Sequence, residues 1–252
     1  MAPRTDPPNR SLSRPARFCI LWSTALLVLT SCSSPEAIKP PQAAPVSVPS
    51  EVLVAPEERS EVAEKLLPVR ARRSWSAEAP GPGQVEHRVE RLSVHHTASP
   101  GAARGKGAER VRKFQRYHQE HKGWPDIAYH FVISPAGTIY EGRSTRYRGD
   151  TATSYDTTGH FLVALDGNFE EGRPSDEAML SLSQLLAWAS QEFAVPAQTI
   201  SGHREHAATA CPGKYLARTI EDGSLLKGVQ SRIAAGPIRI ERVEMSGEGA
   251  PR

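Results

Sequence analysis

The stretch YHFVISPAGTIYEG, residues 129–142, holds two short apolar runs joined by a Pro-Ala-Gly connection. Aromatic and β-branched residues favour strands, and a short connection that contains glycine favours an antiparallel hairpin. Farther along, residues 160–165 read HFLVAL, which has no polar side chain after its first residue. A continuous apolar run of this length is typical of a central strand buried on both faces. Together the two stretches predict the centre of a β-sheet.

Strand and helix patterns alternate on either side of this predicted sheet. We expect further strands over residues 91–95 and 198–201, and helices over residues 108–121 and after a cap at Ser175. The apolar stripes of these helices comprise Val111, Phe114, Tyr117 and His118 in the first and Met179, Leu182, Leu186 and Phe193 in the second. The pattern predicts one α/β domain over residues 71–222, in which helices flank a mixed central β-sheet.

The N-terminal residues 1–31 are typical of an export signal. Arginines precede an uncharged apolar stretch over residues 18–30, which at about 1.5 Å per residue is too short to span a bilayer. The sequence LTSC at residues 29–32 resembles the lipobox of bacterial lipoproteins, whose cysteine is acylated; the alternative is an ordinary signal peptide that contains a cysteine. Serine and not aspartate follows Cys32, which resembles the Gram-negative pattern for sorting to the outer membrane. The resemblance implies a protein anchored by lipid at the periplasmic face of that membrane.

The charge of the chain argues against a polyanionic partner. The 252 residues carry a formal net charge of +3, and the first seventeen of them hold four arginines and one aspartate. Cleavage of the signal therefore leaves a neutral chain, which has no overall field to draw it onto nucleic acid. We expect a monomer with no nucleic-acid partner.

Two weakly patterned segments flank the expected domain. Residues 32–70 are rich in proline and alanine, which predicts an extended tether with a short helix over residues 58–67. Residues 223–252 show little periodicity and end in GEGAPR, which predicts a weakly structured tail.

The run SGHREHAATACPG, residues 201–213, contains the side chains best suited to bind a metal ion. A catalytic zinc site needs three protein ligands and an open position. His203 and Cys211 lie eight residues apart, which is far enough for both side chains to converge on one ion. The third ligand would be His95 or His96, of which strand alternation allows only one to face the ion. By itself, the His–Cys pair is weak support for a metal site.

Six pieces of sequence, in order, resemble the peptidoglycan recognition protein family and the related zinc amidases of phage-lysozyme type. They are RSWSA at residues 73–77, VHHT at 94–97, GWPDIAYHF at 123–131, GTIYEGR at 137–143, DGNF at 166–169, and GHR at 202–204 followed by TACPG at 209–213. The resemblance covers about residues 71–220. It implies the α/β fold of that family, with peptidoglycan or muropeptides as the partner.

The resemblance implies a zinc-dependent N-acetylmuramoyl-L-alanine amidase, which hydrolyses the amide bond between the lactyl group of N-acetylmuramic acid and L-alanine. It places the zinc ligands on His95, His203 and Cys211. It places the catalytic tyrosine on Tyr129 and a second active-site position on Thr209, where phage relatives carry lysine. Family members that only bind peptidoglycan typically lack the cysteine ligand, so Cys211 favours an enzyme.

Two alternative functions stay open. A non-catalytic lipoprotein would use the same groove to hold peptidoglycan or muropeptides without cleaving them. A structural zinc site would have its open position closed by a fourth protein ligand.

The sequence departs from the family at two places that bear on specificity and mechanism. Ser144-Thr145 stand where many relatives have Gly-Trp, which leaves the specificity for the peptide stem open. A second amidase branch uses a glutamate on the central strand as its base. The corresponding position here is Ala164, so the branch that uses a tyrosine fits better.

Other polar side chains near the expected groove are candidates for more than one role. Arg143 is a candidate for substrate contact or for pairing with Glu141, and Arg148 and His206 are candidates for substrate contact or for exposed positions. We expect packing or structural roles for His96, His118 and His130.

Overall fold

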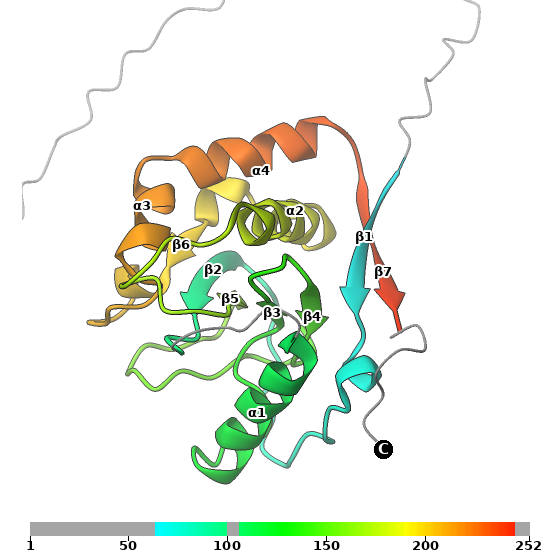
Figure 1. The fold of residues 1–252 in the computed structure, drawn as a ribbon, viewed down its shortest axis with the longest axis vertical. Coiled ribbons are helices and arrows are strands. Elements are labelled where there is room, and N and C mark those ends of the chain that lie inside the picture. The colour runs from blue at the N-terminus through cyan, green and yellow to red at the C-terminus, as the bar shows by residue number, and fades with distance from the viewer. Residues whose placement is uncertain (1–63, 100–105, 245–252) are drawn as a thin grey trace, which may run out of the picture. The chain divides into compact units, whose positions relative to one another are not determined.

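The structure is a computed structural model that describes residues 64–99 and 106–244. The expected signal, the expected lipidation site Cys32 and most of the expected tether lie outside these residues. Within the described ranges, no helix is both long enough and apolar enough to cross a membrane. The described residues place helices on both faces of one sheet (Figure 1).

In the part of the chain that the structure describes, seven strands form this sheet. In order across it they are β6 (Ser201–Gly202), β2 (Arg91–His96), β5 (His160–Leu165), β3 (Phe131–Ile133), β4 (Ile139–Glu141), β1 (Lys65–Arg70) and β7 (Ile238–Val243). Every neighbouring pair is parallel except the β3–β4 hairpin, which Gly137 helps to turn with a φ of +77°. The predicted mixed sheet, its hairpin and its buried central strand β5 are confirmed.

The larger core lies between one face of the sheet and helix α2 (Asp176–Glu192). Ser175 caps this helix, because its hydroxyl accepts a hydrogen bond from the Ala178 N–H at 3.1 Å. Leu182 and Leu186 are fully buried in this core, as their places in the predicted stripe require. The predicted cap and apolar face of α2 are therefore confirmed.

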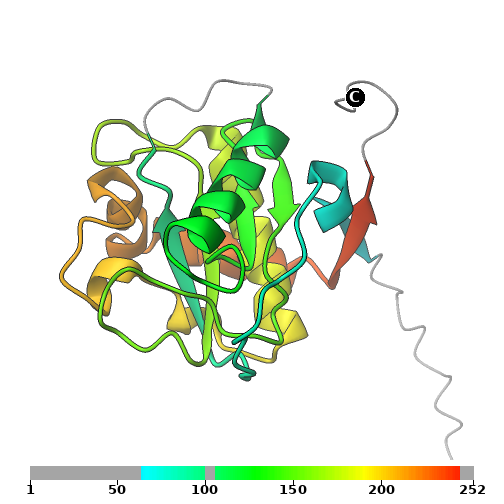
Figure 2. The same cartoon turned by 90° about the horizontal axis from the view of Figure 1, so that it is seen from below.

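The opposite face of the sheet carries a smaller core under helix α1 (Gly107–Glu120), which lies across the sheet in Figure 2. Val111 of this helix packs against Trp75, which ends the short 3-10 helix η1 (Arg72–Trp75). Tyr117 is 48% exposed, so its predicted place in the apolar stripe is wrong. It lines a cavity instead of the core.

The C-terminal segment corrects the expectation of a weakly structured tail. Helix α3 (Lys214–Glu221) leads into helix α4 (Ser224–Ala234), which packs on α2 through the buried Leu225 and Val229. Strand β7 then pairs in parallel with β1 along its whole length. The prediction is wrong for residues 224–243, because tertiary burial stabilises elements whose local periodicity is weak.

The start of the domain and one predicted strand also differ from expectation. Residues 65–70 form β1, so they belong to the sheet and not to the tether, and the helix expected over residues 58–67 is wrong where the structure describes it. The strand expected over residues 198–201 is mostly the 3-10 helix η2 (Ala197–Thr199), and only the two-residue β6 follows it. Strand β1 forms although it contains a proline, because it lies in the sheet between β4 and β7 and pairs with both.

Shortening the side chain through which α4 contacts the core should destabilise the whole domain. We expect Leu225→Ala to lower the free energy of unfolding by about 2–5 kcal/mol, because Leu225 is only 3% exposed. The control Leu180→Ala removes the same atoms from a side chain that is 49% exposed, and its effect should stay within about 0.5 kcal/mol. Denaturant unfolding measures both, and equally small effects would contradict the packing of α4 on the core.

Candidate metal centre

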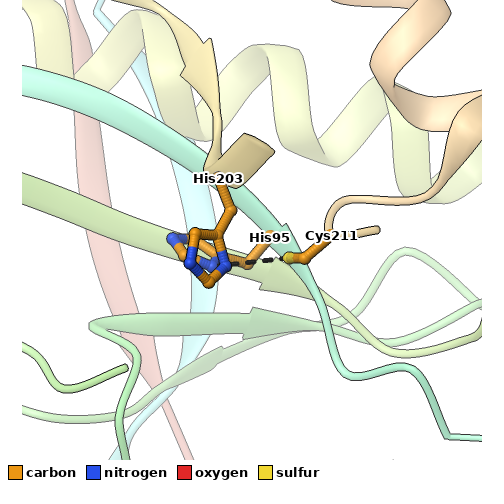
Figure 3. Close-up of side chains that lie close together, drawn as sticks. All are labelled: His95, His203 and Cys211. Carbon is orange, nitrogen blue, oxygen red and sulfur yellow. Dashed lines mark hydrogen bonds between the residues drawn. The ribbon is translucent and has the colours of Figure 1, made fainter. Parts of the chain in front are cut away.

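Three potential metal ligands come together at the carboxyl ends of β2 and β6 (Figure 3). His95 lies on β2, and His203 follows directly after β6. Because these strands are parallel neighbours, with Val94 beside Gly202, the next residue of each lies at the same edge of the sheet. Cys211, from the loop before α3, completes the set, which we call the ligand trio.

The donor atoms of the ligand trio fit a zinc ion. They lie within 4.8 Å of one another, and the Cys211 Sγ is 3.6 Å from the His95 Nδ1. Bond lengths of about 2.0 Å to nitrogen and 2.3 Å to sulfur put such atoms roughly 3.5 Å apart around a tetrahedral ion. Among the described residues the group has these three members, which is the number that catalytic zinc sites use.

Burial sets the charge of the ligand trio. It lowers the pKa of His95 well below its usual value, and the neighbouring His203 lowers that pKa further. Burial also lowers the pKa of His203 to about 4 and raises the pKa of Cys211 to about 12. The imidazoles are therefore neutral, which is the form that binds metal, and a cation in their midst would favour the thiolate of Cys211.

Backbone contacts fix the position of the Cys211 side chain. The His96 N–H donates to the Cys211 sulfur at 3.4 Å, and the Cys211 N–H donates to the Thr209 hydroxyl at 3.2 Å. Gly213 follows with a φ of +90°, and a Cβ at this position would clash with the Phe169 backbone. The loop thus requires glycine after the thiol in order to hold it beside the two histidines.

A cavity of about 330 Å³ opens over the ligand trio. Its lining also includes Tyr117, Lys122, Trp124, Tyr129, Thr151 and Thr209. The ring of Tyr129 lies 5.6 Å from that of His95, so the tyrosine implied by the resemblance is adjacent to a ligand. Burial raises the pKa of Tyr129, and the nearby Cys211 raises it further, so its hydroxyl is protonated and able to donate at neutral pH.

Thr209 lines the same cavity, and its hydroxyl group accepts one hydrogen bond. Its oxygen accepts the Cys211 N–H, which leaves its own proton available to donate. The structure therefore brings the two positions implied to be catalytic, Tyr129 and Thr209, onto one cavity with the ligand trio.

Arg143 does not reach this cavity, and its predicted contact with substrate is wrong. Its side chain is 2% exposed. Its guanidinium donates to the carbonyl oxygens of Asp126, Ile127 and Arg148 and to the Asp150 carboxylate. These bonds use four of its five N–H donors, so the buried Arg143 ties neighbouring loops together and is not turned toward a substrate.

Arg148 and His206 are also absent from the cavity lining among the described residues. Arg148 pairs with Asp156 at 2.9 Å, and the His206 Nε2 lies 2.8 Å from the Ser201 hydroxyl. These contacts do not support a role in substrate binding, which stays a prediction for both residues.

Two histidines outside the ligand trio have structural partners, in line with expectation. The His118 Nδ1 accepts the Ala128 N–H at 3.1 Å, and the His130 Nδ1 accepts the Leu162 N–H at 2.8 Å. Both rings therefore support the backbone around Tyr129. His96 lies on the other side of β2 from His95, where its ring is 6.1 Å from that of Phe169.

Sequence reasoning missed the loop that surrounds His203. Thr151 and Thr153 lie within hydrogen-bond distance of its imidazole, and Tyr155 packs on the ring. Their regular spacing of two residues is visible in the sequence, but nothing local in the sequence connects it with a histidine some fifty positions away.

Comparison with known proteins supports the family resemblance of the sequence. The family described as N-acetylmuramoyl-L-alanine amidase (Amidase_2) matches residues 85–214. An N-acetylmuramoyl-L-alanine amidase of Homo sapiens is 35% identical over 130 residues, which cover 50% of this chain and 22% of the relative, so the chain spans less than a quarter of that protein's length. Peptidoglycan-recognition protein SD of Drosophila melanogaster is 31% identical over 159 residues, 62% of this chain and 85% of the relative.

Solved structures of peptidoglycan recognition proteins share the fold. The structure of the Drosophila protein SD has a TM-score of 0.57 at 28% identity and covers 63% of this chain and 94% of that one. The structure of protein LE in complex with tracheal cytotoxin, a monomeric diaminopimelic acid-type peptidoglycan, has a TM-score of 0.56 at 26% identity and covers 61% and 92%. With its match over residues 85–214, the chain belongs to the N-acetylmuramoyl-L-alanine amidase family.

Proposed function

We propose that this protein is a zinc-dependent hydrolase that cleaves the amide bond between the lactyl group of N-acetylmuramic acid and L-alanine in peptidoglycan. The observation that carries the proposal is the convergence of two imidazoles and one thiol in a cavity that Tyr129 also lines. Family membership supports the assignment of the amide bond that is cleaved. The structure of a relative in complex with a monomeric peptidoglycan supports the assignment of the substrate class.

His95, His203 and Cys211 would hold the ion. Zinc, when bound, supplies a Lewis acid for the amide carbonyl and for water at neutral pH. The protein contributes a buried set of two neutral imidazoles and one thiolate, which leaves a net charge of +1 on the loaded site. That positive charge attracts the negative charge that develops on the carbonyl oxygen as the amide is attacked.

Tyr129 would act on the reacting atoms directly. Its protonated hydroxyl donates a hydrogen bond either to the oxyanion that develops from the carbonyl or to the attacking water. The free proton of the Thr209 hydroxyl is a second donor on the same cavity. Both donors belong to a preformed site, so little reorganisation is needed when charge develops.

We further propose that the enzyme works at the cell wall while held to the membrane by lipid. The LTSC sequence supports acylation of Cys32, and the proline-rich residues that follow support a tether between anchor and domain. The substrate would then be peptidoglycan or its fragments in the periplasm, in the course of wall turnover.

Release of peptide from purified protein tests the proposal. Incubation with muramyl-peptide substrates should yield free peptide with an N-terminal alanine and the intact lactyl sugar, which mass spectrometry identifies. A chelator should abolish the release and added zinc should restore it, because the zinc ion supplies the positive charge at the ligand trio. Tight binding of muropeptide without any release by the zinc-loaded protein would favour a non-catalytic binding lipoprotein instead.

A further inference from the structure

The loop between β4 and β5 holds the imidazole of His203 through three alternate residues. The Thr153 Oγ1 lies 2.8 Å from the His203 Nε2, and the Thr151 Oγ1 lies 3.2 Å from it. The ring of Tyr155 packs on the imidazole with a centroid distance of 5.1 Å. The proposed hydrolysis uses none of these three contacts, so they call for another explanation.

The two hydroxyl groups decide which nitrogen of His203 is free for a metal. Because both lie within hydrogen-bond distance of Nε2, Nδ1 is the nitrogen left for the ion. A metal takes the lone pair of a nitrogen that carries no proton, so the neutral imidazole then has its proton on Nε2. That N–H needs an acceptor, and the Thr153 oxygen is the nearer of the two.

A short chain of hydrogen bonds extends from this contact. With its oxygen accepting from Nε2, the Thr153 hydroxyl donates its own proton to the Thr151 Oγ1 at 2.9 Å. The Thr153 N–H lies 3.3 Å from the same oxygen and also donates to it. Thr151 therefore holds the Thr153 side chain in place, and its own proton is left to point toward the cavity that it lines.

We propose that Thr153, supported by Thr151, is a positioning residue that fixes the His203 imidazole with its Nδ1 directed at the metal. The inference rests on the proposed zinc site. Ligating histidines usually donate their second N–H to a carboxylate, a backbone carbonyl or water. The acceptor here is a neutral hydroxyl, so it orients the ring without adding negative charge, and the loaded site keeps its net positive charge for the substrate.

Zinc affinity measured on the full-length protein tests this role without reference to activity. Thr153→Val replaces the hydroxyl with a methyl group of similar size and should weaken zinc binding about 10–100-fold in competition with a chelator. Thr153→Ser restores the hydroxyl and should bind zinc like the wild type. The matched control is Thr158→Val on the same loop, whose hydroxyl donates to Asp156 and not to His203, and its affinity should be unchanged.

Two further measurements separate positioning from general stability. Thermal unfolding in excess chelator should be the same for wild type and Thr153→Val, and NMR of the zinc-loaded proteins should show faster exchange of the His203 Nε2–H in the variant. Equal zinc affinity of Thr153→Val and wild type would overturn the inference, and so would a loss of affinity matched by a loss of metal-free stability. Failure of the wild type itself to bind zinc would instead overturn the proposed function.

Discussion

Cys211→Ser should abolish stoichiometric zinc binding and lower the rate of peptide release at least about 10³-fold. A Lewis acid contributes several kcal/mol to such a reaction, and each 1.4 kcal/mol or so is tenfold in rate. The ligand trio has one thiolate, so its loss removes the negative charge that this trio offers to the ion. An alcohol at this position stays protonated at neutral pH and cannot replace it.

Metal analysis of purified Cys211→Ser and a kinetic assay check this expectation. The control is His121→Ala, which removes an exposed imidazole near the cavity and should leave one zinc ion per chain. Unfolding in excess chelator should differ little between wild type and Cys211→Ser, because serine fills nearly the same volume. Full zinc content together with normal turnover in Cys211→Ser would contradict the ligand role of the thiol.

Much of this candidate site could be predicted from the sequence, because parallel strands bring their carboxyl ends to one edge of a sheet. Strand alternation alone indicated that only one of His95 and His96 would face the ion, and the structure places His95 with the other ligands. The family resemblance supplied Tyr129. The error at Arg143 has a different origin. The residue belongs to a motif of the family, but only the fold reveals that its guanidinium donates hydrogen bonds to backbone carbonyl oxygens.

The parts of the fold that the sequence did not predict are those that depend on distant partners. Strand β7 alternates Ile238 and Ile240 with charged residues, yet its partner β1 lies more than 160 positions earlier in the chain. Strand β1 itself contains Pro68, which argues against a strand in any local analysis. Pairing between the two ends of the domain stabilises both segments, and no window of one segment contains that information.

Tyr129→Phe should lower the rate of peptide release about 10²–10³-fold and leave zinc content unchanged, which distinguishes it from loss of a ligand. The variant removes one hydroxyl and keeps the ring that packs beside His95 and His118. The size of the effect is that of one hydrogen-bond donor aimed at developing negative charge in a buried site. Burial and Cys211 both hold the pKa of Tyr129 above its usual value, so the donor is in place throughout the neutral range.

The kinetic pattern of Tyr129→Phe is as informative as its size. A donor that acts only on charge that develops during reaction should lower kcat and kcat/KM together, whereas a contact made equally with bound substrate should raise KM at constant kcat. Tyr117→Phe is the matched control, because Tyr117 lines the same cavity but is 48% exposed, and its ring lies against those of His118 and His121. Normal kcat in Tyr129→Phe would assign the hydroxyl to substrate binding, and the Thr209 hydroxyl on the same cavity would then be the candidate donor to the oxyanion.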